Sequence, residues 1–407
     1  MSKYNELTKM FSILIKENHM ENDIKSIYLY GSLAQDDFEK GYSDIDLWII
    51  IKEYTSVKER INITRKIIKL FDVAINDYLD SIHSDYQLKR YHYHGNWYFT
   101  EREFIDYVKL YPTRVLYPIY FGVWKSIYGN DYVDQFKLPQ HKKLVEYLML
   151  DFEVFVREIE SNLFCNNCRE LVKYTMRMIK KALWILDGQY IENRNLTICK
   201  ATKFFTETNL FLEFSSWLSI AQKNNYKLNS EQQIDLCINI SNIIDFLVEK
   251  IRKYLNKENI KLIQEHDVVM AELWGNFLWS FTEILTDYIN IPEGNRRELI
   301  LYLTDSYYKL IRYYIYVIRH KIPMDKYFGK KELPLKNSVL NKQFLERNFA
   351  KEELYKYKGT QFLLDTHMQK IIDNYFERMN ELDIRKYIEQ DFLREIYNLY
   401  SSIIKNK

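Results

Sequence analysis

The chain has 407 residues, 47% of them hydrophobic, which predicts two or three domains with cores of their own. Its 58 basic and 56 acidic side chains leave a net charge of +2, which gives no electrostatic support for a dedicated nucleic-acid-binding protein. Only 10 glycines and 6 prolines interrupt the chain, which argues against a large sandwich or barrel and favours a mostly helical protein.

Cysteine usage and hydropathy indicate a cytoplasmic protein. Four cysteines in a chain of this length are not a disulfide scaffold, and the lone pair Cys165 and Cys168 lacks the second pair that a zinc site needs. The first residues carry no signal-peptide pattern, and no uncharged apolar run reaches the length of a membrane span. We therefore expect no membrane association.

The N-terminal part alternates helical and strand patterns. Apolar residues at helical spacing predict helices over 4–18 and 56–80. Short β-branched and aromatic runs predict strands over 24–30, 42–51 and 97–100. Three of the six prolines lie between residues 112 and 139, and we place a domain boundary at residue 139.

The rest of the chain has helical spacing almost throughout. Breaks are expected at Gly188, at residues 191–195 and at residues 292–294, and a loop is expected over 321–336. The predicted fold class is α+β, with a small mixed-sheet domain over residues 1–139 followed by a large all-helical region. That region is divided into residues 140–260 and a second helical domain over residues 261–407.

One combination of residues carries chemistry. Gly31 and Ser32 end the first strand, where a glycine backbone and the following amides can approach a phosphate. Asp44 and Asp46 lie two residues apart on the second strand, so both carboxylates project from one face and suit Mg²⁺. A phosphate cradle beside a two-carboxylate metal site is what phosphoryl transfer needs.

Gly31 and Ser32 followed by Asp44 and Asp46 resemble the signature of the polymerase-β-like nucleotidyltransferase superfamily, over about the first 135 residues. Within that superfamily the chain looks most like bacterial nucleotidyltransferases of aminoglycosides and lincosamides. Residues 124–131 are similar to the Tyr-Gly-x-Asp segment that ends such catalytic domains, and residues 169–200 are similar to their helical domain.

The resemblance implies a reaction and its ligands. A nucleoside monophosphate, AMP from ATP, would pass to a hydroxyl of a small molecule with Mg²⁺ bound. Residues 140–260 would close over the nucleotide, and Arg177 and Lys200, on either side of the turn at Gly188, would offer cations to its phosphates. Nucleic acid is a possible but less favoured partner.

The chain departs from the family pattern at the third carboxylate, which serves as metal ligand or general base. No acid lies within the strand 97–100 where one is expected. Glu101 at the end of that strand is our candidate, with Asp72 and His94 as alternatives. A toxin that modifies RNA or a protein, and a degenerate nucleotide-binding module, remain alternative functions.

Overall fold

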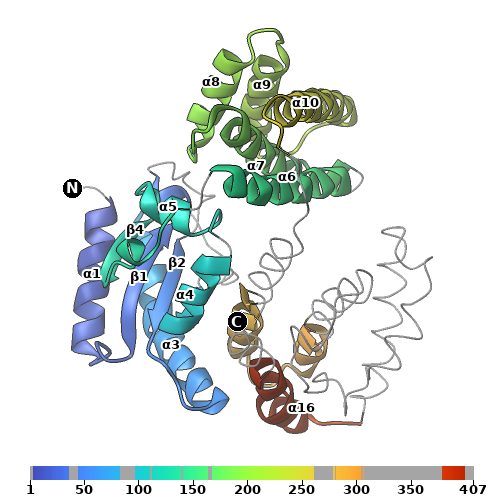
Figure 1. The fold of residues 1–407 in the computed structure, drawn as a ribbon. Helices are drawn as coiled ribbons and strands as arrows, with labels where there is room; N and C mark the ends of the chain where they lie inside the picture. The colour runs from blue at the N-terminus through green and yellow to red at the C-terminus, as the bar shows by residue number, and fades with distance from the viewer. Residues whose placement is uncertain are drawn as a thin grey trace.

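The computed structural model describes residues 3–35, 45–82, 97–110, 112–138, 141–163, 167–260, 278–279, 281–303, 306 and 378–398. They form a small mixed sheet covered by helices, followed by a helical region (Figure 1). The predicted α+β class is confirmed.

Four strands make the sheet, in the order β3-β2-β1-β4. They are β1 (Ile24–Tyr30), β2 (Asp46–Ile51), β3 (Trp97–Thr100) and β4 (Lys125–Gly129). β1 is antiparallel to both β2 and β4, whereas β2 and β3 are parallel. The first three strands were predicted, and β4 was not.

Each face of the sheet is covered by a different set of helices. One face packs on α1 (Lys3–Glu17) and α3 (Val57–Ile82), for example through Phe11 and Phe71, whose rings are 4.8 Å apart. The other face, centred on Trp48, packs on residues of α4 (Glu101–Leu110) and α5 (Leu116–Tyr120).

The described residues near the C-terminus cover this second face as well. They are helical residues 281–290 and 296–303, α16 (Glu381–Tyr387) and the π-helical turn η4 (Ile388–Phe392). The interruption between the first two helices falls at the predicted break, where Gly294 has a φ of 92°. These residues share one hydrophobic cluster with the sheet instead of forming a core of their own. The domain boundaries drawn from the sequence stay predictions.

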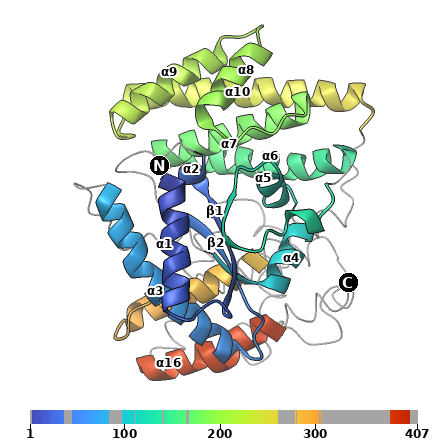
Figure 2. The same cartoon turned by 90° about the vertical axis from the view of Figure 1, so that its left-hand side faces the viewer.

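The helical region has a separate core. Its helices are α6 (His141–Leu163), α7 (Cys168–Asp187), α8 (Arg194–Phe204), α9 (Leu210–Lys223) and α10 (Ser230–Lys257). α7 ends at Gly188 in the left-handed conformation, as the break in the sequence predicts, and Asn193 caps the start of α8. Figure 2 shows the region lying at the end of the sheet where α2 and α5 are found. No described helix is long and apolar enough to cross a membrane.

A buried ion pair ties β3 to helices α3 and α4. The Arg60 guanidinium lies 2.9 Å from the Glu103 carboxylate, and the two side chains are 0% and 2% exposed. The Tyr54 hydroxyl and the Thr100 amide donate to the same carboxylate, at 3.0 and 2.9 Å. Burial, and next the Glu103 charge, raise the pKa of Tyr54, so its phenol remains a donor. The network fixes two helices to the end of one strand.

We expect Arg60→Met to lower the free energy of unfolding by about 3–5 kcal/mol, because it leaves the Glu103 carboxylate buried without its counter-charge. Arg102→Met is the matched control, since Arg102 is 56% exposed and its ion pair with Asp106 is 3.8 Å long. Its effect should stay below about 1 kcal/mol. Urea denaturation measures both, and equal effects would contradict the role of the buried pair.

Candidate functional site

The carboxylate of Asp46 is in direct contact with the turn that follows β1. Asp46 is the first residue of β2 and pairs with Tyr30, the last residue of β1. Gly31 leaves the strand with a φ of +73°, and a Cβ placed on it would lie 2.1 Å from Asp46 Oδ2. Glycine is therefore required at position 31 for two reasons: the left-handed backbone conformation and the close approach of the carboxylate.

Helix α2 (Gly31–Ala34) begins at this contact, so Ser32 is one residue away from it. Tyr30, at the N-cap, gives no side-chain hydrogen bond to the first amides of α2. Amides of such a turn, together with a hydroxyl, are donors for phosphate oxygens. Three residues singled out in the sequence, Gly31, Ser32 and Asp46, thus lie at one end of the sheet.

The carboxylate of Asp46 is one that could hold a metal ion. Side chains alternate along β2, so Asp46 belongs to the face that carries Trp48 and is partly exposed at the strand end. Its carboxylate is the hard oxygen donor that Mg²⁺ prefers. Asp44 lies outside the described residues, so its pairing with Asp46 stays a prediction. Over the described ranges, no three His, Cys, Asp or Glu side chains gather in a way that could hold a metal ion.

Glu101 lies at the wrong end of the sheet for the role predicted from the sequence. β2 and β3 are parallel and pair Ile51 with Thr100, so Glu101 follows the strand end opposite to Asp46. Asp46 is five residues from Ile51, which is roughly 17 Å along a strand. Glu101 instead acts on Tyr132, where burial and then this carboxylate raise the pKa of the phenol to about 12. The structure does not bring Glu101 to Asp46, and this prediction is corrected.

The two alternatives to Glu101 differ in their outcome. Asp72 influences Tyr98, whose phenol has its pKa raised by burial and, to a lesser degree, by the Asp72 carboxylate. Tyr98 packs in the cluster of α1 and α3, on the face of the sheet opposite to Asp46. Asp72 is therefore not a neighbour of Asp46. His94 lies outside the described residues, and its role stays a prediction.

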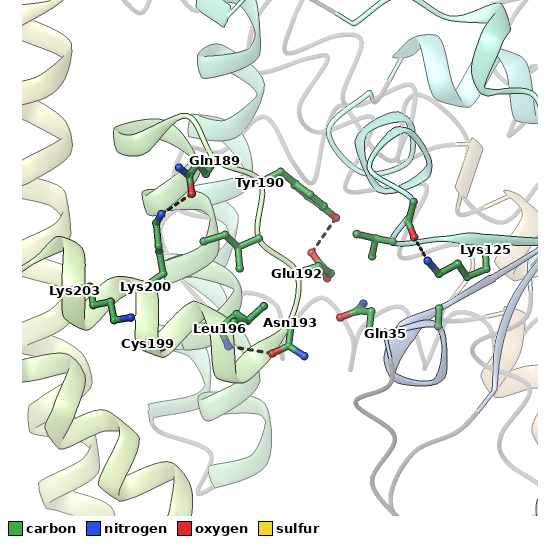
Figure 3. A pocket seen from close by; sticks show the side chains of 14 residues that line it. Gln35, Lys125, Gln189, Tyr190, Glu192, Asn193, Leu196, Cys199, Lys200 and Lys203 are labelled. Carbon is green, nitrogen blue, oxygen red and sulfur yellow. Dashed lines mark hydrogen bonds between the residues drawn. The ribbon is translucent and has the colours of Figure 1, made fainter. Parts of the chain in front are cut away.

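A cavity of about 550 Å³ opens between α2 and the helical region (Figure 3). Its walls come from three segments that are distant in the sequence: residues 34–35, residues 122–125, and the stretch from residue 189 to residue 203. Lys125 pairs with Leu29 on β1, so the cavity lies at the same end of the sheet as Asp46.

The lining of the cavity is cationic. Its charged side chains are Lys125, Lys200, Lys203 and Glu192. Lys200 Nζ donates to Gln189 Oε1 at 2.6 Å and lies 3.4 Å from Asp187 Oδ2. Lys203 is exposed and forms no ion pair with any residue that the structure describes. An anionic group such as a phosphate suits these charges.

The structure separates the two cations that the sequence groups together. Lys200 lines the cavity, whereas Arg177 is exposed on α7 and does not line it. The Arg177 guanidinium lies 5.7 Å from the ring centre of Tyr174. Arg114, which the sequence did not single out, also acts on Tyr174 and lies 5.7 Å from the Trp279 ring.

The sequence carried a signal for one of the missed lysines. Lys203 is three residues after Lys200, and positions i and i+3 of a helix lie on one side. Lys125 carried no such signal, because its place in the cavity depends on the pairing of β4 with β1.

One comparison with known proteins agrees with this site. Residues 14–102 match the family model described as polymerase beta, nucleotidyltransferase. The match includes β1, the turn at Gly31 and Ser32, β2 and β3. Residues 14–102 thus correspond to a nucleotidyltransferase domain of the polymerase-β-like type, which supports a transferase acting on a nucleotide substrate. No curated protein and no solved structure matches the chain.

We expect Gly31→Ala to reduce nucleotidyl transfer by about 100-fold or more, because the new Cβ must displace the Asp46 carboxylate. Gly294→Ala is the control: Gly294 also has a positive φ, of +92°, but a Cβ there meets nothing within 4 Å. Both variants carry a backbone strain of about 1–2 kcal/mol. Pyrophosphate release measures transfer and thermal melting measures stability. Similar activity of the two variants would show that the collision with Asp46 is unimportant.

Proposed function

We propose that the chain transfers a nucleoside monophosphate, AMP from ATP, to a hydroxyl of a small molecule, with Mg²⁺ bound. The observation that supports this most directly is the contact between Gly31 and the Asp46 carboxylate. It joins a turn suited to phosphate with a carboxylate suited to Mg²⁺, which is the combination that phosphoryl transfer requires.

The reaction is an in-line displacement. The acceptor hydroxyl oxygen forms a bond to the α-phosphorus, the bond from this phosphorus to pyrophosphate breaks, and the hydroxyl proton passes to a base. Asp46, with Asp44 two residues earlier, would hold the metal ion. Bound Mg²⁺ supplies charge neutralisation on the phosphate oxygens. The amides and hydroxyl of Gly31 and Ser32 orient the triphosphate, so catalysis rests on positioning and electrostatics.

The cationic cavity is suited to the far end of the triphosphate. It begins at Ala34 and Gln35, immediately after the turn at Gly31, and Lys200 lines it from the helical region. Lys200 takes the phosphate role inferred from the family resemblance. A role of Arg177 in binding the phosphates has less support, because Arg177 lies outside the cavity lining.

The acceptor is proposed to be an antibiotic of the aminoglycoside or lincosamide type. Three lysines against one glutamate make the cavity unfavourable for a polycation such as an aminoglycoside. The acceptor would therefore reach Asp46 from outside this cavity, at the partly exposed start of β2.

A second candidate is an acceptor hydroxyl on RNA or on a protein. Tyr120 and Phe121 are 55% and 52% exposed at the end of α5, directly before the cavity residues 122–125. Exposed aromatic rings beside lysines can stack bases and hold a phosphate backbone. This arrangement favours RNA over a protein acceptor.

Mass spectrometry of acceptors tests the proposal. The protein is incubated with Mg²⁺, each of the four ribonucleoside triphosphates and a panel of aminoglycosides and lincosamides. We expect one antibiotic to gain a single nucleoside monophosphate with ATP, and Asp46→Asn or chelation of Mg²⁺ to abolish the product. Label on added RNA or on a protein alone would overturn the small-molecule acceptor. Triphosphate binding with no labelled acceptor would indicate a nucleotide-binding module instead.

Lys200→Met should weaken triphosphate binding by about 10–100-fold, which corresponds to one lost hydrogen bond to a charged group. Arg177→Met removes an equally charged side chain outside the cavity and should leave binding within about twofold of wild type. Calorimetry gives the two affinities. Equal losses of affinity in the two variants would contradict a phosphate-binding role that Lys200 has and Arg177 lacks.

Alkylation of Cys199 tests independently whether triphosphate binds in the same cavity. Cys199 is a free, exposed thiol in the lining, so a bound triphosphate should shield it from a maleimide. The variant Cys199→Ser shows how much of the total maleimide labelling occurs at the other cysteines. Protection by triphosphate in wild type, and its loss in Lys200→Met, are the expected results. Labelling that triphosphate does not change would place the nucleotide outside this cavity.

A further inference from the structure

The turn after α7 meets the catalytic part through one aromatic ring, that of Tyr190. Its ring stacks on Phe121 at 5.5 Å, with 16° between the planes, and meets the edge of Trp184 at 4.7 Å and 71°. Phe121 directly follows α5, whereas Trp184 lies on α7 of the helical region. Tyr190 therefore bridges the two walls of the cavity, which it also lines.

Two charged residues hold this ring in place. The Tyr190 hydroxyl donates to Glu192 Oε2 at 3.0 Å, and Lys180 Nζ lies 3.3 Å from Glu192 Oε1. Burial lowers the pKa of Lys180, and the Glu192 charge opposes this effect. Figure 3 shows Tyr190 and Glu192 projecting from the turn, with Gln35 and Lys125 on the other side of the cavity.

A second contact between the same elements behaves differently. Tyr117 of α5 meets Trp184 edge to face at 4.7 Å, but it is only 4% exposed and belongs to the core of the helical region. Tyr117 is a buried anchor that joins the two parts. Tyr190 lines the cavity, and Phe121 directly precedes the lining residue Gly122, so a change in their contact would change the width of the opening.

We propose that Tyr190 is a positioning residue that sets the distance between Lys200 and the Gly31 turn, and that Glu192 and Lys180 act through it. This inference rests on the proposed function, because the group to be positioned is the triphosphate. Tyr190 holds the helical region against the end of α5, so that the lysines of both walls reach one anion. Without the ring, the walls separate and each lysine acts alone.

Glu192 gives the proposal a sharp test. It is the one carboxylate among the described residues of the lining, so by charge alone its removal should strengthen the binding of a triphosphate. If Glu192 holds Tyr190 in place, its removal should weaken binding instead. The two explanations predict opposite signs for the same variant.

The experiment measures ATP binding to the full chain by calorimetry with Mg²⁺ and no acceptor. We expect Tyr190→Ala to weaken binding by about tenfold, from the loss of two aromatic contacts. Glu192→Ala should weaken it by several-fold, and Tyr190→Phe, which keeps both ring contacts but loses the hydrogen bond to Glu192, should weaken it to a similar degree. The control is Tyr254→Ala, which removes a half-buried tyrosine of α10 outside the cavity lining.

The outcomes separate the two proposals. If wild type binds no triphosphate, the proposed function fails, whatever the variants do. If wild type binds and Glu192→Ala binds more tightly, or if Tyr190→Ala matches Tyr254→Ala, the positioning role is overturned. Thermal melting of each variant identifies any loss of folding, and Tyr190→Phe supplies a folded comparison if Tyr190→Ala is unstable.

Discussion

The absence of a side chain at residue 31 is the constraint on which the site depends. β1 and β2 are antiparallel with Tyr30 opposite Asp46, so the chain must leave β1 beside the carboxylate. Only glycine allows this, because a Cβ would lie 2.1 Å from the carboxylate oxygen. The start of α2, the position of Ser32 and the near wall of the cavity all follow from that single close approach.

The two ends of the sheet use charge in opposite ways. At the end of β3, Arg60 and Glu103 are fully buried and paired, and they hold helices in place. At the end where β2 begins, Asp46 is partly exposed and the nearby cavity carries more lysines than carboxylates. Buried charges that pair with each other hold the fold together. An excess of positive charge at an open surface is suited to binding a ligand of negative charge.

The sequence predicts the parts of this fold that depend on local pattern. The strands 24–30 and 97–100 and the break at Gly188 agree with the structure because apolar runs and glycine act locally. β4 was missed because only Ile127 of its five residues is buried, so it lacks a strand pattern. Glu101 was misplaced because the order of residues shows that it follows a strand but does not show which way that strand runs.

The family match covers only one of the segments that build the candidate site and its cavity. The family match ends at residue 102, before β4 and before the whole helical region. It therefore contains the turn at Gly31 and the carboxylate of Asp46 but none of the three lysines of the cavity. Transfer chemistry depends on the matched segment, whereas the charges that would select a nucleotide or an acceptor come from outside it. Two chains with the same match could thus act on different acceptors, because in the proposed function specificity would depend on how the helical region meets α5.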